Sequence, residues 1–181
     1  FVDGLAETLL GAVAAEPASR FSSDNYATFP WRTAPFWGND AFVSDGFFDI
    51  PTPQLSTWPD RYYHSSKDTP DRMSANTLGR VGAAAGAFLY LLATAGPREA
   101  RWFGILAADD WKRRICRAVA EGVTAGLSEA QPEEAAARLV SSARHLGLQA
   151  SDAVIQAERF ARGDAGIASE LRALADDVRA F

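Results

Sequence analysis

One short polar segment of the chain holds residue types that could carry out chemistry. Residues 62–70 have the sequence YYHSSKDTP, and His64 in this segment is one of only two histidines. Histidine and tyrosine side chains can both take part in proton transfer during catalysis. Tyr63 and His64 are therefore candidates for a reactive site, and the alternative is a packed loop with an incidental imidazole.

The segments on both sides of this turn follow a recognisable order. Upstream, FFDIPTPQLSTW predicts a short strand over Ile50–Ser56, and its prolines favour the edge of a sheet. Downstream, Ser74 can cap the first turn of a long helix. That helix is rich in glycine, which lowers its helix propensity and is typical of close approach to a neighbouring sheet or helix.

This order resembles the C-terminal part of the zinc-dependent aminopeptidases of metallopeptidase family 28, clan MH. Asp49-Ile50-Pro51 is similar to the family's Gly-Ile-Pro at the end of a strand. Residues 63–69 (YHSSKDT) are similar to its Tyr-His-Thr-x-x-Asp-Thr-like segment, and residues 38–42 (GNDAF) resemble its Ser-Asp-His-x-x-Phe segment. The resemblance spans roughly residues 1–96.

The resemblance implies roles for individual residues. His64 would be the last metal ligand, bound to one zinc ion of a pair. Tyr63 would donate its hydroxyl to the oxyanion of the tetrahedral intermediate. Asp68 and Thr69 would support the loop and lead towards the helix that follows it.

Two upstream residues complete the candidate site. Asp40 would have a supporting role, because the adjacent histidine of the family's segment is Ala41 here. Trp37 is a candidate for the pocket that receives the substrate side chain. The implied function is removal of N-terminal residues from peptides by water that two zinc ions activate.

The chain departs from the family in the ligands that it lacks. A site of this type needs another histidine, a bridging aspartate, a pair of glutamates and a further aspartate. Residues 1–63 contain no histidine, and their only glutamates are the isolated Glu7 and Glu16. We therefore expect the missing N-terminal half of the domain, or another chain, to complete the centre, and we expect this chain alone to be inactive.

These observations predict a fold and leave other functions open. We expect residues 1–96 to form part of a mixed-sheet α/β domain of the aminopeptidase type, and residues 97–181 to form an all-α extension. One alternative function is a receptor-like interaction or dimerisation module that has lost its metals. Another is amide chemistry of the glutaminyl cyclase type.

Composition excludes some classes of partner. A net charge of −5 and a pI near 5.0 argue against a nucleic-acid-binding face. The apolar run over residues 81–96 is shorter than the roughly 20 residues that span a membrane, so we expect no membrane span. The single cysteine, Cys116, excludes an intrachain disulfide and favours a reducing, cytoplasmic compartment. The chain begins with Phe1 and lacks a basic leader, which suggests a processed or internal start.

The remaining sequence predicts helices and their ends. We expect helices over residues 2–13, 99–127 with a break near Gly104, 132–147, 151–162 and 164–180. Gly147 and Gly163 are predicted helix stops. Glu133-Glu134 follows Pro132 and is interpreted as a helix start rather than a catalytic pair. The basic residues between 112 and 117 favour a solvated helix face or a salt-bridge patch in a homo-oligomer.

Overall fold

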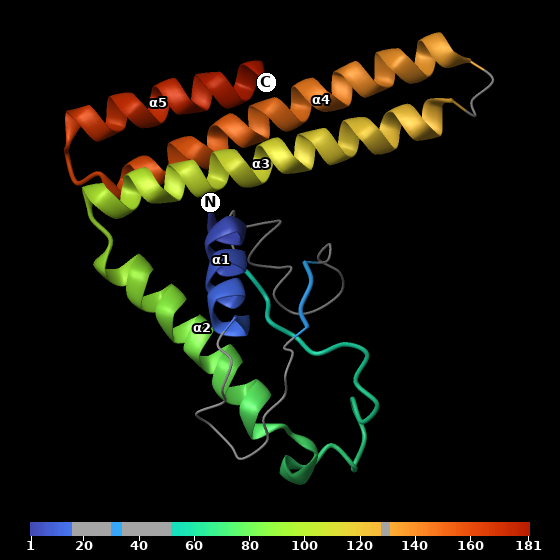
Figure 1. Cartoon of the computed structure of the whole chain (residues 1–181), viewed down its shortest axis with the longest axis vertical. Helices are drawn as coiled ribbons and strands as arrows, with labels where there is room; N and C mark the ends of the chain where they lie inside the picture. The colour runs from blue at the N-terminus through green and yellow to red at the C-terminus, as the bar shows by residue number, and fades with distance from the viewer. Residues whose placement is uncertain (16–29, 34–51, 128–130) are drawn as a thin grey trace. The chain divides into compact units, whose positions relative to one another are not determined.

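The computed structural model describes residues 1–15, 30–33, 52–127 and 131–181. Its elements, in chain order, are α1 (Val2–Ala14), η2 (Pro70–Arg72), α2 (Ala75–Thr94), α3 (Pro97–Gly126), α4 (Pro132–Ile155), η3 (Gln156–Phe160) and α5 (Ala165–Ala180) (Figure 1). Every regular element among the described residues is a helix.

The predicted α/β fold is wrong for the described part of the chain. The strand expected over Ile50–Ser56 is absent from its described residues, 52–56, which have no regular structure. Pro53 has no backbone N–H and cannot donate a ladder hydrogen bond, and the chain around it offers no partner strand among the described residues. Ile50 and Pro51 lie outside the described residues. The architecture here is all-helical.

The chain separates into two compact units, which we describe one at a time. One unit consists of Phe1, Asp3–Leu5 and residues 93–181. The other consists of Val2 and residues 6–92.

The larger unit is a hairpin of α3 and α4 with α5 packed against both helices (Figure 1). Phe103, Val154, Leu171 and Val178 are fully buried and form its core. The ring of Phe1 stacks on that of Phe103, with 5.2 Å between centroids. Burial of such large apolar side chains contributes about 1.5–3 kcal/mol each, which makes this cluster the main source of the unit's stability.

Two glycines inside the hairpin mark where α5 comes closest. A Cβ at Gly104 would overlap Cδ2 of Leu171, and a Cβ at Gly147 would lie 3.1 Å from the carbonyl oxygen of Arg179. Both predictions for these residues are wrong, because α3 continues through Gly104 and α4 continues through Gly147. The glycines make room for a neighbouring helix and do not end their own helices.

The helix starts follow local chemistry. Asp164 accepts hydrogen bonds from the backbone N–H groups of Gly166 and Ile167 and caps α5. Glu133 and Glu134 lie in the first turn of α4, which confirms their interpretation as a helix start. At the start of α3 the Glu99 carboxylate accepts from the Gly96 N–H at 3.0 Å, and this backbone hydrogen bond lowers the pKa of Glu99.

In the smaller unit a buried arginine joins α1 to α2. Arg80 donates from Nη1 to the carbonyl oxygen of Val13 at 2.8 Å and from Nε to Oδ1 of Asn76 at 3.1 Å. Arg80 and Asn76 are both buried. The α2 helix begins as predicted, because the Thr77 N–H donates to Oγ of Ser74 at 3.2 Å.

Helix α2 is longer than its apolar run in the sequence suggested. With 20 residues it is long and apolar enough, by length and composition alone, to cross a membrane. The expectation that the chain has no membrane span therefore stays a prediction.

We predict opposite effects for two alanine substitutions in α3. Gly104→Ala should lower the free energy of unfolding by about 1–3 kcal/mol, because the added methyl group overpacks the contact with Leu171. Gly126→Ala should be neutral or stabilising by up to about 1 kcal/mol, because its Cβ would meet Ala135 at an ordinary 3.5 Å and alanine favours the helix. Urea unfolding followed by circular dichroism measures both, and equal effects would contradict the packing at Gly104.

We also predict that Arg80→Met destabilises the smaller unit. The change removes charged donors from the Val13 carbonyl and from Asn76, and such hydrogen bonds contribute about 1.5–3 kcal/mol each. Arg117→Met, at an exposed position of α3, should change stability by less than about 0.5 kcal/mol. Hydrogen exchange of the α1 and α2 amides reports the difference, and unchanged protection in Arg80→Met would refute the role of Arg80.

Candidate functional site

The Tyr63–His64 segment lies in a loop that closes on itself through local hydrogen bonds. The Tyr62 N–H donates to Oδ1 of Asp60 at 2.8 Å. The Tyr62 carbonyl oxygen accepts from the Ser65 N–H at 3.0 Å and from the Ser65 hydroxyl at 2.7 Å. The Asp68 N–H then donates to the Ser65 carbonyl oxygen at 3.2 Å. The loop is therefore built from contacts within one short stretch.

His64 occupies the tightest point of this loop. Its φ of 55° lies in the left-handed region, which is uncommon for a residue with a Cβ. The imidazole is exposed and stacks on the Tyr63 ring, with 3.9 Å between centroids and 17° between planes. The Trp58 ring packs edge-on against the Tyr63 ring, with 5.6 Å between centroids. The rings of Tyr63 and Trp58 thus help to fix the position of the imidazole.

Asp68 and Thr69, the two residues expected to support the loop, lie at its C-terminal end. Asp68 contributes its backbone N–H to the turn, and its side chain is exposed. The Thr69 hydroxyl donates to the carboxylate of Asp71, in the first turn of η2, and also lies 3.4 Å from the Lys67 carbonyl oxygen. These contacts join the loop to η2 just before α2 begins.

The upstream candidates lie outside the described residues. This applies to Asp40, to Trp37 and to the Asp49-Ile50-Pro51 segment. The structure therefore brings Tyr63 and His64 together and gives no position for the residues expected to complete a pocket around them.

The described residues do not fit a two-zinc centre by themselves. No group of three or more His, Cys, Asp and Glu side chains that could hold a metal occurs in residues 1–15, 30–33, 52–127 and 131–181. His64 offers one imidazole, and a single imidazole is not a metal site. Any zinc ion held at His64 would need ligands from beyond this part of the chain.

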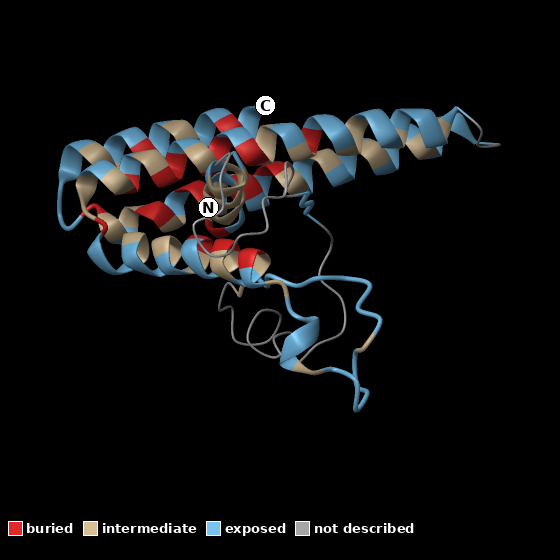
Figure 2. Cartoon of the chain, turned by 60° about the horizontal axis from the view of Figure 1, so that its bottom comes forward, coloured by how far each residue is buried: buried red, intermediate tan, exposed pale blue. Residues whose placement is uncertain are grey.

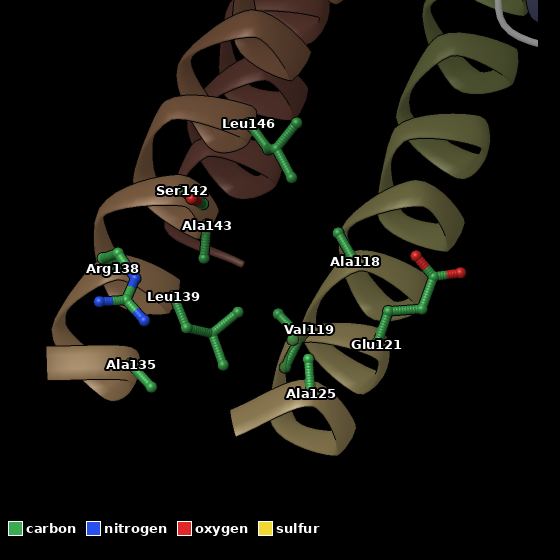
Figure 3. A pocket seen from close by; sticks show the side chains of 11 residues that line it. Ala118, Val119, Glu121, Ala125, Ala135, Arg138, Leu139, Ser142, Ala143 and Leu146 are labelled. Carbon is green, nitrogen blue, oxygen red and sulfur yellow. The ribbon is translucent and has the colours of Figure 1, made fainter. Parts of the chain in front are cut away.

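A cleft that the sequence did not predict lies between α3 and α4, with a volume of about 460 Å³ (Figure 3). Small residues at three- and four-residue spacing, such as Ala118, Gly122 and Ala125, line it. Its two charged residues are Glu121 on α3 and Arg138 on α4, and they do not converge, since Glu121 points away from α4 in Figure 3. The cleft is thus a packing feature of two helices, with no arrangement of groups for catalysis.

The other histidine and the single cysteine do not form a site with the described residues. His145 lies inside α4, which continues to Ile155. Cys116 is exposed. Neither residue has a described neighbour that would make it a site.

Comparison with known proteins adds no assignment to this geometry. No family model matches the chain, and no curated protein or solved structure matches it. The resemblance to zinc aminopeptidases therefore depends on the residues of the chain alone.

Proposed function

We propose that residues 62–70 supply the tyrosine–histidine corner of a zinc aminopeptidase centre that acts on the N-terminal residues of peptides. The observation that carries the proposal is the presentation of His64, whose exposed imidazole stacks on Tyr63 at a left-handed backbone position. The other ligands would come from outside the described residues. The proposal concerns this corner and implies no sheet in the described part of the chain.

The backbone of His64 supports a functional interpretation. A residue other than glycine in the left-handed region costs about 1–3 kcal/mol, and such strain is concentrated at functional sites. Glycine would avoid this cost, and asparagine would reduce it. The hydrogen bonds of Ser65 to Tyr62 on one side and of Asp68 to Ser65 on the other hold the conformation in place. A histidine kept at this position is explained by a need for its imidazole.

The stacking of His64 on Tyr63 also supports the proposed role of His64 as a metal ligand. The Tyr63 ring limits rotation of the imidazole, and Trp58 in turn restrains Tyr63. Within the described part of the chain, no residue forms a hydrogen bond with either ring nitrogen of His64. A ligand histidine needs one accessible nitrogen for the metal, and a partner for its other ring nitrogen usually sets its orientation. The stack on Tyr63 supports the orientation of His64, and a partner for its second ring nitrogen would come from beyond the described residues.

The proposal predicts that His64→Asn abolishes zinc binding and aminopeptidase activity in the full-length natural protein. Asparagine tolerates the left-handed backbone and lacks the imidazole, so the loop persists while the ligand is lost. We expect at least a 10-fold loss of zinc affinity, since even the outer partners of metal ligands contribute 10- to 100-fold. Metal analysis and hydrolysis of aminoacyl reporter substrates measure the two properties.

Two controls sharpen this test. His145→Asn changes the only other histidine, at an exposed position of α4, and should leave both properties intact. Tyr63→Phe keeps the ring stack and removes the hydroxyl, so it should lower the rate of hydrolysis and spare zinc content. Wild-type protein without zinc or peptidase activity, or a His64→Asn variant that retains both, would refute the proposal.

A further inference from the structure

We propose that two copies of this chain pair through the outer half of the α3–α4 hairpin, with their hairpins antiparallel. The outer half is defined as residues 113–126 of α3 and 132–146 of α4. The proposed interface is the face of this half that lies on the same side of the hairpin as α5. This inference goes beyond the Tyr63–His64 corner and does not depend on it.

The outer half begins where α5 ends. The last turns of α5 are attached to the hairpin by the Lys112–Asp177 ion pair, with 2.6 Å between Nζ and Oδ2, and by the approach of Arg179 to Gly147. Helix α5 stops at Ala180, whereas the hairpin continues beyond it to the α3–α4 turn (Figure 1). Beyond Arg114, which forms an ion pair with Asp3 of α1, the outer half has no third helix among the described residues.

The exposed face of the outer half continues the apolar surface that α5 covers. Val123 follows Lys112 by about three helical turns, and Val140 precedes Gly147 by about two turns, so both lie on the α5 side of their helices. Each of these valines is 50% exposed, and Leu127, one turn beyond Val123, is 83% exposed. Figure 2 shows how far the outer half is exposed compared with the part that α5 covers.

Two charges at the ends of this face identify the occupant as a second copy. Glu133 and Arg144 are separated by about three turns of α4, so they share a face, and Val140 lies between them. Both are exposed, and neither forms an ion pair with another described residue. In a two-fold pair each surface must complement itself. A two-fold axis midway between the two residues places Glu133 against Arg144 of the second copy, twice.

Of the two possible arrangements, only the antiparallel one pairs opposite charges and avoids a clash between the two α5 helices. With parallel hairpins Glu133 would face Glu133 of the second copy, and like charges repel. The two α5 helices would also meet, because α5 occupies the same face of each hairpin. With antiparallel hairpins the outer halves overlap, and each α5 lies beyond Pro132, the first residue of α4, of the other copy. The overlap from Glu133 to Arg144 is about 16 Å long, so the dimer should dissociate on dilution.

Sedimentation velocity of the 181-residue chain over a concentration series tests the proposal. The wild-type chain should form a reversible dimer. Glu133→Arg and Arg144→Glu should each weaken dimerisation by about 10-fold or more, because each places like charges at both ends of the interface. The double variant, Glu133→Arg with Arg144→Glu, should restore it, because the pairs are re-formed in reverse.

A matched control separates the interface from effects on the helix. Glu134→Arg makes the same charge change in the same first turn of α4 but on another side of the helix, and should leave dimerisation unchanged. Circular dichroism confirms that each variant is folded. A wild-type chain that stays monomeric would overturn the proposal. This is the result expected if a partner protein, rather than a second copy, covers this face. A double variant that fails to recover would overturn the antiparallel pairing.

Discussion

The close approach of α5 to the α3–α4 hairpin is the constraint on which the larger unit depends. Leu171 occupies the space that a Cβ at Gly104 would need, and the backbone at Arg179 reaches Gly147. Leu171 and Val178 of α5 are buried, as are Val154 and Phe103 of the hairpin. A Cβ at either glycine would require Leu171 or the backbone at Arg179 to shift. The helix-propensity cost of glycine, up to about 1 kcal/mol, is thus offset by the close packing of α5.

The same constraint explains why the hairpin has two different halves. Where α5 lies, the residues between α3 and α4 are buried, as at Ala150 and Val154. Beyond Arg114 and Gly147, no third helix among the described residues packs on the two helices, and residues such as Val123 and Val140 remain half exposed. An isolated pair of helices buries little surface, and most of the stability of a helix in a protein comes from tertiary packing. A third helical layer is what the inner half has and the outer half lacks.

Local signals in the sequence predicted helix starts well and helix continuity poorly. Ser74, Pro132 and Asp164 act through groups within one turn, so their effects are visible in the sequence. Gly104 and Gly147 depend on residues about 67 and 32 positions away, as the numbering of Leu171 and Arg179 shows. A glycine that ends a helix and one that admits a neighbouring helix look alike locally. The expected strand rested on resemblance around two prolines, and resemblance of short motifs does not establish a sheet.

In the candidate site, too, the features that depend on local interactions were predictable from the sequence and those that depend on distant residues were not. The loop around His64 is closed by bonds among residues 60–72, so a motif of nine residues was enough to single out Tyr63 and His64. Metal ligands, in contrast, come from segments that tertiary structure brings together, and one motif cannot specify the others. A left-handed histidine stacked on a tyrosine costs free energy without adding to any core. The proposed metal role would account for that cost, and it requires further ligands from beyond the residues that hold the loop together.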